Sequence, residues 1–82
     1  MGRSMNRRSL RVLLEAEHVR EDAYSLEGDH DESMCLEPVA GGWAVYYSER
    51  GLRSGERRFE TEDEACQFLA ARLLADPSNR VK

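Results

Sequence analysis

The side chains of this chain that are able to do chemistry are two cysteines, two histidines and a large set of carboxylates. Nucleophilic catalysis needs a Ser or Cys beside a base that a third group holds in place. Cys66 falls on the apolar side of a predicted helix and Cys35 lies in a predicted strand, so we expect both in the core. They also lack a metal-ligand spacing. We therefore expect no catalytic residue, and two reduced thiols rather than a disulfide.

A run of four residues with metal-ligating atoms, Asp29-His30-Asp31-Glu32, lies in a polar, turn-rich segment. Its spacing departs from the calcium-loop pattern, because no glycine and no distant glutamate fall at the required offsets. The only paired glycines, Gly41-Gly42, fit a hairpin turn better than a phosphate-binding loop. We expect no metal and no cofactor. The run is then either a solvated acidic loop or an acidic contact surface for a basic partner.

The charges are spread unevenly along the chain, whose formal net charge is −4. Residues 1–11 hold four arginines and no acid, whereas residues 12–41 hold nine acids and one base. The negative field of this middle part would repel nucleic acid and attract a basic protein surface.

A second charged segment combines basic and aromatic residues, as nucleic-acid-binding surfaces do. Its arginines are Arg50, Arg53, Arg57 and Arg58, and its aromatic residues are Tyr46 and Tyr47. Three glutamates, Glu49, Glu56 and Glu60, lie between these and weaken the field. The alternating signs suit ion pairs on a solvated sheet face. A protein contact and a nucleic-acid contact are the alternatives.

The element that must position these groups is the stretch 42–48, in which Trp43, Val45 and Tyr47 point one way and the residues between them the other. Trp, Val and Tyr are typical of a half-buried strand. We expect Trp43 to anchor the core, although it could instead be the exposed anchor of an interface. Tyr46 then faces away from Trp43 and is the best candidate for an exposed aromatic residue.

Shorter strands are predicted at 24–27, 34–39 and 56–60, with 52–55 as loop or ragged strand. Apolar residues recur at three- and four-residue steps from Leu10 to Ala23, behind a candidate N-cap at Ser9. Thr61-Glu62-Asp63-Glu64 has the pattern of a capping box, and the helix behind it ends at Asp76-Pro77.

With 82 residues the chain makes one domain. We expect a disordered basic arm at 1–8, an α+β domain at 9–76 and a frayed tail at 77–82. The domain is predicted to be a small antiparallel meander of three or four strands, with an N-terminal and a C-terminal helix packed on one face, in the order α-β-β-β-β-α or α-β-β-β-α. The other face would stay partly open.

The apolar runs are far shorter than the roughly 20 residues that cross a bilayer. No apolar segment follows the N-terminal arginines, as a secretory signal would require. We therefore expect a cytoplasmic protein that has no membrane partner.

Four motifs carry a resemblance to a known class of proteins. They are Tyr24-Ser25-Leu26-x-Gly28, Cys35-Leu36-Glu37, Gly42-Trp43-x-Val45-Tyr46-Tyr47-Ser48-Glu49-Arg50-Gly51 and Phe59-x-Thr61-Glu62-x-Glu64-Ala65-Cys66. Over about Leu13 to Leu74 the chain resembles small actinobacterial immunity proteins of polymorphic toxin systems. The resemblance implies a cytoplasmic inhibitor that blocks the active site of a cognate toxin domain. It names no toxin and transfers no functional residue.

The sequence therefore favours a non-enzymatic protein-binding module whose negative surface enters the basic cleft of a toxin domain. The predicted partner-binding residues are Asp29, Asp31, Glu32, Glu37, Tyr46, Glu49, Arg50 and Arg53. One alternative is a small nucleic-acid-associated regulator that uses the N-terminal arginines. Another is a structural homodimer that pairs open sheet edges.

Overall fold

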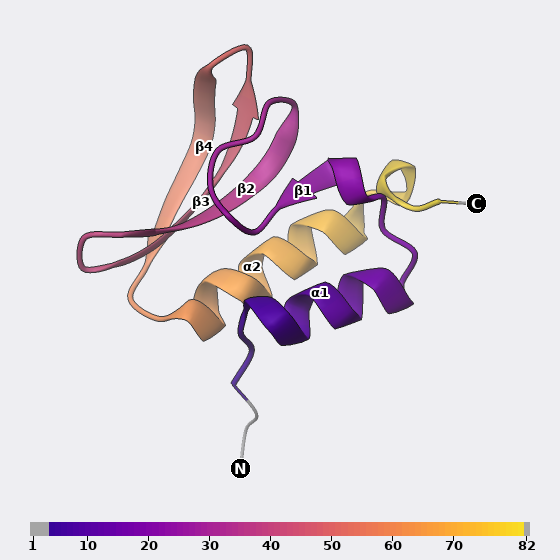
Figure 1. Cartoon of the computed structure of the whole chain (residues 1–82), viewed down its shortest axis with the longest axis horizontal. Coiled ribbons are helices and arrows are strands. Elements are labelled where there is room, and N and C mark those ends of the chain that lie inside the picture. The colour runs from indigo at the N-terminus through magenta and orange to yellow at the C-terminus, as the bar shows by residue number, and fades with distance from the viewer. Residues whose placement is uncertain (1–3, 82) are drawn as a thin grey trace.

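The computed structural model describes residues 4–81. Its elements are α1 (Arg7–Ala16), the 3-10 helix η1 (Glu21–Ala23), β1 (Tyr24–Ser25), β2 (Ser33–Val39), β3 (Gly42–Glu49), β4 (Leu52–Phe59), α2 (Glu62–Ala75) and the 3-10 helix η2 (Pro77–Asn79). The strands form one sheet in the order β1-β2-β3-β4, and both helices lie on the same side of it (Figure 1). The predicted α+β fold, with one helix before the sheet and one after it, is confirmed.

The first strand differs from the predicted meander. β1 pairs with β2 in parallel, with Tyr24 opposite Met34 and Ser25 opposite Cys35. β2, β3 and β4 pair antiparallel, as predicted, so the sheet as a whole is mixed. Alternation of side chains is the same in parallel and antiparallel strands, and it therefore carries no information on strand direction.

The main core lies between the helices and the sheet. Leu10 and Leu14 of α1 and Leu69 of α2 are fully buried against Leu36 and Val45 of the two central strands. Full burial of such a side chain stabilises the fold by about 1.5–3 kcal/mol. Trp43 is partly buried and packs against this cluster, so it lies on the core side of the sheet, as predicted, but at the margin of the core.

Glycines are required at both turns that connect the three long strands and at the start of β3: Gly41, in the β2–β3 turn, has a positive φ of 81°. A Cβ on Gly42 would lie 2.1 Å from the carbonyl oxygen of Phe59, so β3 can approach β4 here only with glycine. The β3–β4 turn has positive φ at Arg50 (53°) and Gly51 (79°), which is the backbone of a type I′ hairpin. β4 begins at Leu52, so 52–55 is strand, and the register shift between Val45 and Tyr47 makes it the irregular strand that was one of the two predicted alternatives.

The first helix begins earlier and ends earlier than predicted. Asn6, not Ser9, is its N-cap: the Asn6 side chain accepts from the Ser9 N–H at 2.9 Å, and Ser9 Oγ accepts from the Asn6 N–H at 3.0 Å. The predicted continuation to Ala23 is wrong, because α1 ends at Ala16 and η1 follows as a separate turn. In α2 the predicted cap is confirmed, since Thr61 Oγ1 accepts from the Glu64 N–H at 3.2 Å.

Both ends of the described chain are held by hydrogen bonds. In the predicted arm, residues 1–3 lie outside the described residues, whereas the Met5 N–H donates to Asp63 Oδ1 at 2.6 Å and 7–8 belong to α1. In the predicted tail, Lys82 lies outside the described residues. The carbonyl of Asn79 accepts from the Arg20 N–H at 2.7 Å, so 77–81 are docked rather than frayed.

Candidate protein-binding surface

The acidic loop between β1 and β2 is folded against the end of the sheet, and hydrogen bonds fix its backbone. The Gly28 N–H donates to the carbonyl of Leu36 at 3.1 Å. The hydroxyl of Ser33 donates to the carbonyl of His30 at 2.8 Å, and the His30 N–H reaches Cys35 Sγ at 3.4 Å. The loop therefore has an ordered backbone although its side chains are largely solvent-exposed.

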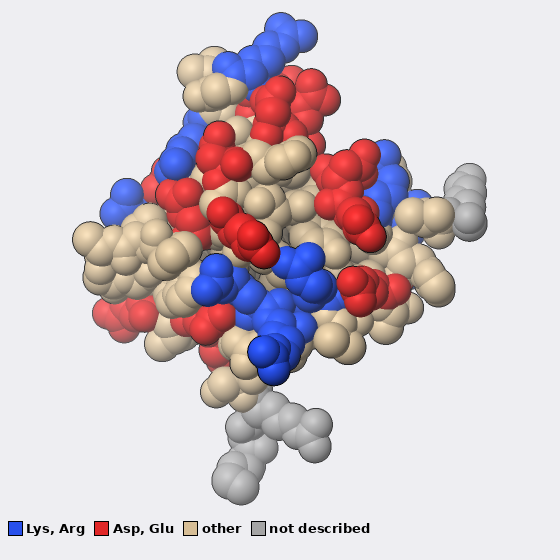
Figure 2. Space-filling view, in the orientation of Figure 1, with Lys and Arg blue, Asp and Glu red and all other residues tan. Residues whose placement is uncertain are grey.

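Asp31 joins this loop to the β3–β4 turn, because its Oδ1 accepts a hydrogen bond from the Arg50 N–H at 2.5 Å. Glu32 and Glu49, the chain neighbours of Asp31 and Arg50, are exposed, and so is Asp29, whose charge acts on Arg53. We call the exposed group Asp29, Asp31, Glu32, Glu49 and Arg50 the acidic tip. Figure 2 shows carboxylates gathered near this upper end of the molecule, with a basic side chain at the very top. Five of the eight predicted partner-binding residues thus lie together and exposed.

The other three predicted residues, Glu37, Tyr46 and Arg53, form a cluster on the sheet face opposite the helices. The Tyr46 hydroxyl donates to Glu37 Oε1 at 3.0 Å. The Arg53 guanidinium lies 4.1 Å from the centroid of the Tyr46 ring and 3.1 Å from Glu37 Oε2. Tyr46 is buried and Glu37 is largely covered in this cluster, whereas the Arg53 side chain is still 41% exposed.

Tyr46 faces away from Trp43, as the alternation predicts, but the prediction that it is an exposed aromatic residue is wrong. Its exposed fraction is 0%, because Arg53 covers the ring and the residue packs with Cys35 and Ala44 in a second, smaller core. Burial, and then the hydrogen bond to Glu37, raise the pKa of Tyr46. This face of the sheet is accordingly closed at its centre, and Tyr46 supports the surface instead of forming it.

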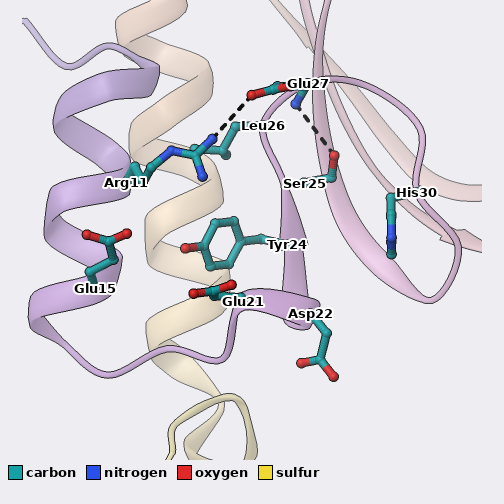
Figure 3. A pocket seen from close by; sticks show the side chains of 9 residues that line it. All are labelled: Arg11, Glu15, Glu21, Asp22, Tyr24, Ser25, Leu26, Glu27 and His30. Carbon is teal, nitrogen blue, oxygen red and sulfur yellow. Dashed lines mark hydrogen bonds and ion pairs between the residues drawn. The ribbon is translucent and has the colours of Figure 1, made fainter.

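A hollow of about 430 Å³ lies beside the acidic loop, between α1, η1 and β1 (Figure 3). Its lining includes several ionisable or hydrogen-bonding side chains, among them Arg11, Glu15, Glu21, Tyr24, Glu27 and His30. Tyr24 is 7% exposed, and its hydroxyl makes no hydrogen bond to any residue in 4–81. Burial raises the pKa of Tyr24; Arg11 opposes this shift, and the nearby charges of Glu15 and Glu21 add to it.

The predicted helical pattern from Leu10 to Ala23 gives no sign of this hollow, because one continuous helix would carry both Glu15 and Glu21 along its length. The break after Ala16 turns the chain, so that η1 and β1 lie across from α1 and the two carboxylates face a common space (Figure 3). A helix-ending signal before Val19 would have been the only clue, and the sequence has no Gly or Pro there.

Both cysteines are buried and free, as predicted for core residues. Burial, together with the charges of Glu62 and Asp63, raises the pKa of Cys66 to about 11, so its thiol is protonated at neutral pH. Within residues 4–81, no group of three or more His, Cys, Asp or Glu side chains is arranged to hold a metal ion. In the same range, no helix is long and apolar enough to cross a membrane.

The arginines of β4 do not form one basic surface. Arg57 lies over the Phe68 ring at 5.6 Å from its centroid, on the helix side of the sheet. Arg58 instead pairs with Glu56 at 3.1 Å. The interleaved glutamates therefore neutralise part of the basic charge, as the alternating signs indicated.

No family profile, no curated protein and no solved structure matches this chain. The resemblance to immunity proteins therefore stays a prediction that rests on the four motifs quoted above.

Proposed function

We propose that the protein is a non-enzymatic inhibitor that places its acidic tip in the basic cleft of a partner protein and so keeps substrate out of that cleft. The observation that carries this proposal is the fixed backbone of the acidic loop, whose carboxylates remain exposed. A loop that is already ordered loses little conformational freedom on binding. Complementary charge would speed the encounter with a basic surface.

In this proposal the partner is a bacterial toxin domain. The resemblance to immunity proteins implies such a partner, and the inhibitor would act in the cytoplasm before the toxin reaches its substrate. Such an inhibitor needs shape, charge and a slow dissociation rate, but no reaction of its own. Glu37 and Tyr46 would contribute by holding the sheet beneath the acidic loop, whereas Arg53 is exposed and could also contact the partner.

A homodimer formed through β4 is the second candidate, because the outer edge of this eight-residue strand has no neighbouring strand among the described residues. Leu52 on that strand is 73% exposed. Two such edges can pair by backbone hydrogen bonds, although the charges of Arg53, Glu56 and Arg57 work against it. Sedimentation of the full chain distinguishes the two, since the inhibitor proposal expects a monomer.

A nucleic-acid-associated regulator has less support. Arg7 pairs with Glu62 at 3.7 Å and Arg11 with Glu27 at 3.5 Å, so two of the N-terminal arginines are partly neutralised. A titration with duplex DNA and with RNA at low salt tests this alternative, because phosphate contacts depend steeply on salt. Binding that weakens strongly as salt rises would favour it over the inhibitor proposal.

The inhibitor proposal is tested by affinity capture from the native host, followed by binding kinetics of the captured protein. The Asp29→Asn/Glu32→Gln variant removes two charges from the acidic tip, and Glu60→Gln/Glu64→Gln removes two from a distant exposed segment as a matched control. We expect a basic enzyme domain whose association slows by roughly tenfold with the tip variant, while the control behaves as wild type. Capture of no such partner, or equal rates for both variants, would contradict the proposal.

A further inference from the structure

The hollow between α1, η1 and β1 has acidic walls with unsatisfied charge. Four carboxylates line it, against the single guanidinium of Arg11. Glu27 pairs with Arg11 at 3.5 Å, and Asp22 pairs with Arg20 at 3.6 Å. The remaining two, Glu15 and Glu21, make no ion pair with any residue in 4–81.

The floor of the hollow supplies a separate observation. Tyr24 is more than nine-tenths buried, and its hydroxyl lacks a hydrogen-bond partner among the described residues. Figure 3 shows this hydroxyl directed toward α1, into the space between Arg11, Glu15 and Glu21. Ser48 Oγ, not the Tyr24 hydroxyl, is the buried unpartnered side-chain atom of the described residues, so the Tyr24 oxygen is still reached from the hollow. It is therefore free to accept a hydrogen bond from a polar group that enters the hollow.

We propose that the hollow is a subsite for one arginine side chain of the partner protein, an inference that rests on the inhibitor function proposed above. The guanidinium would lie between Glu15 and Glu21 and donate an N–H to the hydroxyl oxygen of Tyr24. The pair of Arg11 and Glu27 stays intact and bounds the hollow on one side.

Arginine fits this lining better than lysine. The three acceptors come from three different elements, α1, η1 and β1, and therefore surround the space from several directions. A guanidinium presents five N–H donors in one plane, whereas an ammonium is a compact point charge. Because burial raises the pKa of Tyr24, its hydroxyl is neutral near pH 7 and adds no competing negative charge.

The subsite is continuous with the acidic loop. Glu27 and His30 line the hollow and also belong to the loop that carries Asp29, Asp31 and Glu32. A single basic partner surface can therefore engage the acidic tip and insert an arginine beside it. Such an inserted side chain would act as an anchor that slows dissociation, while the tip speeds association.

The test uses small probes with the full chain, so it needs no partner. We would titrate isotope-labelled protein with N-acetyl-arginine amide, with the lysine equivalent, and with the uncharged citrulline equivalent, and follow backbone amide signals by NMR. We expect saturable shifts at Glu15, Glu21 and Tyr24 with arginine, at least threefold weaker binding with lysine, and no saturable shift with citrulline. Arginine binding that is no tighter than citrulline binding at these residues would overturn the proposal.

Two variants and one control assign the binding to the hollow. Glu15→Gln/Glu21→Gln changes only exposed side chains and should weaken arginine binding by roughly tenfold or more. Tyr24→Phe keeps the ring and should weaken it several-fold. Glu60→Gln/Glu64→Gln removes the same charge elsewhere and should leave it unchanged. An equal loss with the double variant and the control would mean that net charge alone attracts the probe, which overturns the subsite.

The outcomes separate this inference from the proposed function. If arginine amide binds in the hollow but no basic partner is captured, the guanidinium site stands and the inhibitor function fails. If a partner depends on the acidic tip, yet it binds Glu15→Gln/Glu21→Gln as tightly as wild type, the inhibitor function stands and the subsite fails.

Discussion

The two faces of the sheet are buried by different means. On the helix side, Leu36 and Val45 pack against leucines of α1 and α2. On the opposite side, Tyr46 is covered by the Arg53 guanidinium, which also pairs with Glu37. Apolar packing is non-directional, whereas a hydrogen-bonded ion pair fixes orientation. Packing on the helix side therefore provides most of the stability of the fold. The hydrogen-bonded cluster on the opposite side holds the strands beneath the acidic loop in a fixed orientation.

Removing a leucine from the helix side should have the largest effect. Leu69→Ala deletes a fully buried side chain and leaves a cavity, so we expect the free energy of unfolding to fall by about 2–5 kcal/mol. Urea denaturation measures this loss. A cost below about 1 kcal/mol would mean that the helix side is less well packed than described.

Removing the acceptor on the opposite side should cost less. Glu37→Ala leaves the Tyr46 hydroxyl and the Arg53 guanidinium without their shared partner, and we expect a loss of about 1–3 kcal/mol in the same assay. Glu37→Gln keeps an acceptor and is the matched control, with a smaller loss. If Glu37→Ala cost as much as Leu69→Ala, the division between the two faces would be wrong.

Removing only the phenolic hydroxyl should have a still smaller effect. Tyr46→Phe keeps the ring under Arg53 and loses one hydrogen bond, for an expected cost of about 1 kcal/mol. A double-mutant cycle with Glu37→Ala, which removes the acceptor, isolates the contribution of that bond. Additive losses in the cycle would show that the hydroxyl and the carboxylate are not coupled.

The smallest effect concerns pH. Hydrogen bonds from the Met5 N–H and from Gln67 hold the pKa of Asp63 below its ordinary value. The carboxylate therefore stabilises the fold above the unfolded-state pKa of about 3.9, and this contribution is lost as pH falls through the lower folded-state value. Thermal unfolding of wild type and Asp63→Asn should converge as pH is lowered through this range. A constant difference between them would contradict this assignment.

Local patterns in the sequence were enough to predict parts of the fold. Alternation placed Trp43 and Tyr46 on opposite faces of β3, and the capping box placed the start of α2 at Thr61. Both signals act within a few residues, where side-chain direction and helix-end hydrogen bonding follow from the local backbone.

Long-range contacts could not be predicted in the same way. Tyr46 is buried because the Arg53 side chain of the next strand lies over its ring. Alternation predicts which face a side chain points to, but not whether a neighbouring strand covers it. The parallel direction of β1 and the hollow around Tyr24 both follow from the course of the chain after Ala16. The candidate surface was therefore predicted in its acidic loop and missed in its hollow.

The central claim is that a pre-ordered acidic tip recognises a basic cleft, and the salt dependence of association tests it most directly. We would measure the association rate of the captured partner with wild type and with Asp29→Asn/Glu32→Gln over a range of ionic strength. The account predicts a steep fall for wild type as salt screens the charges, and a shallower fall for the variant. Identical slopes for the two proteins would contradict it.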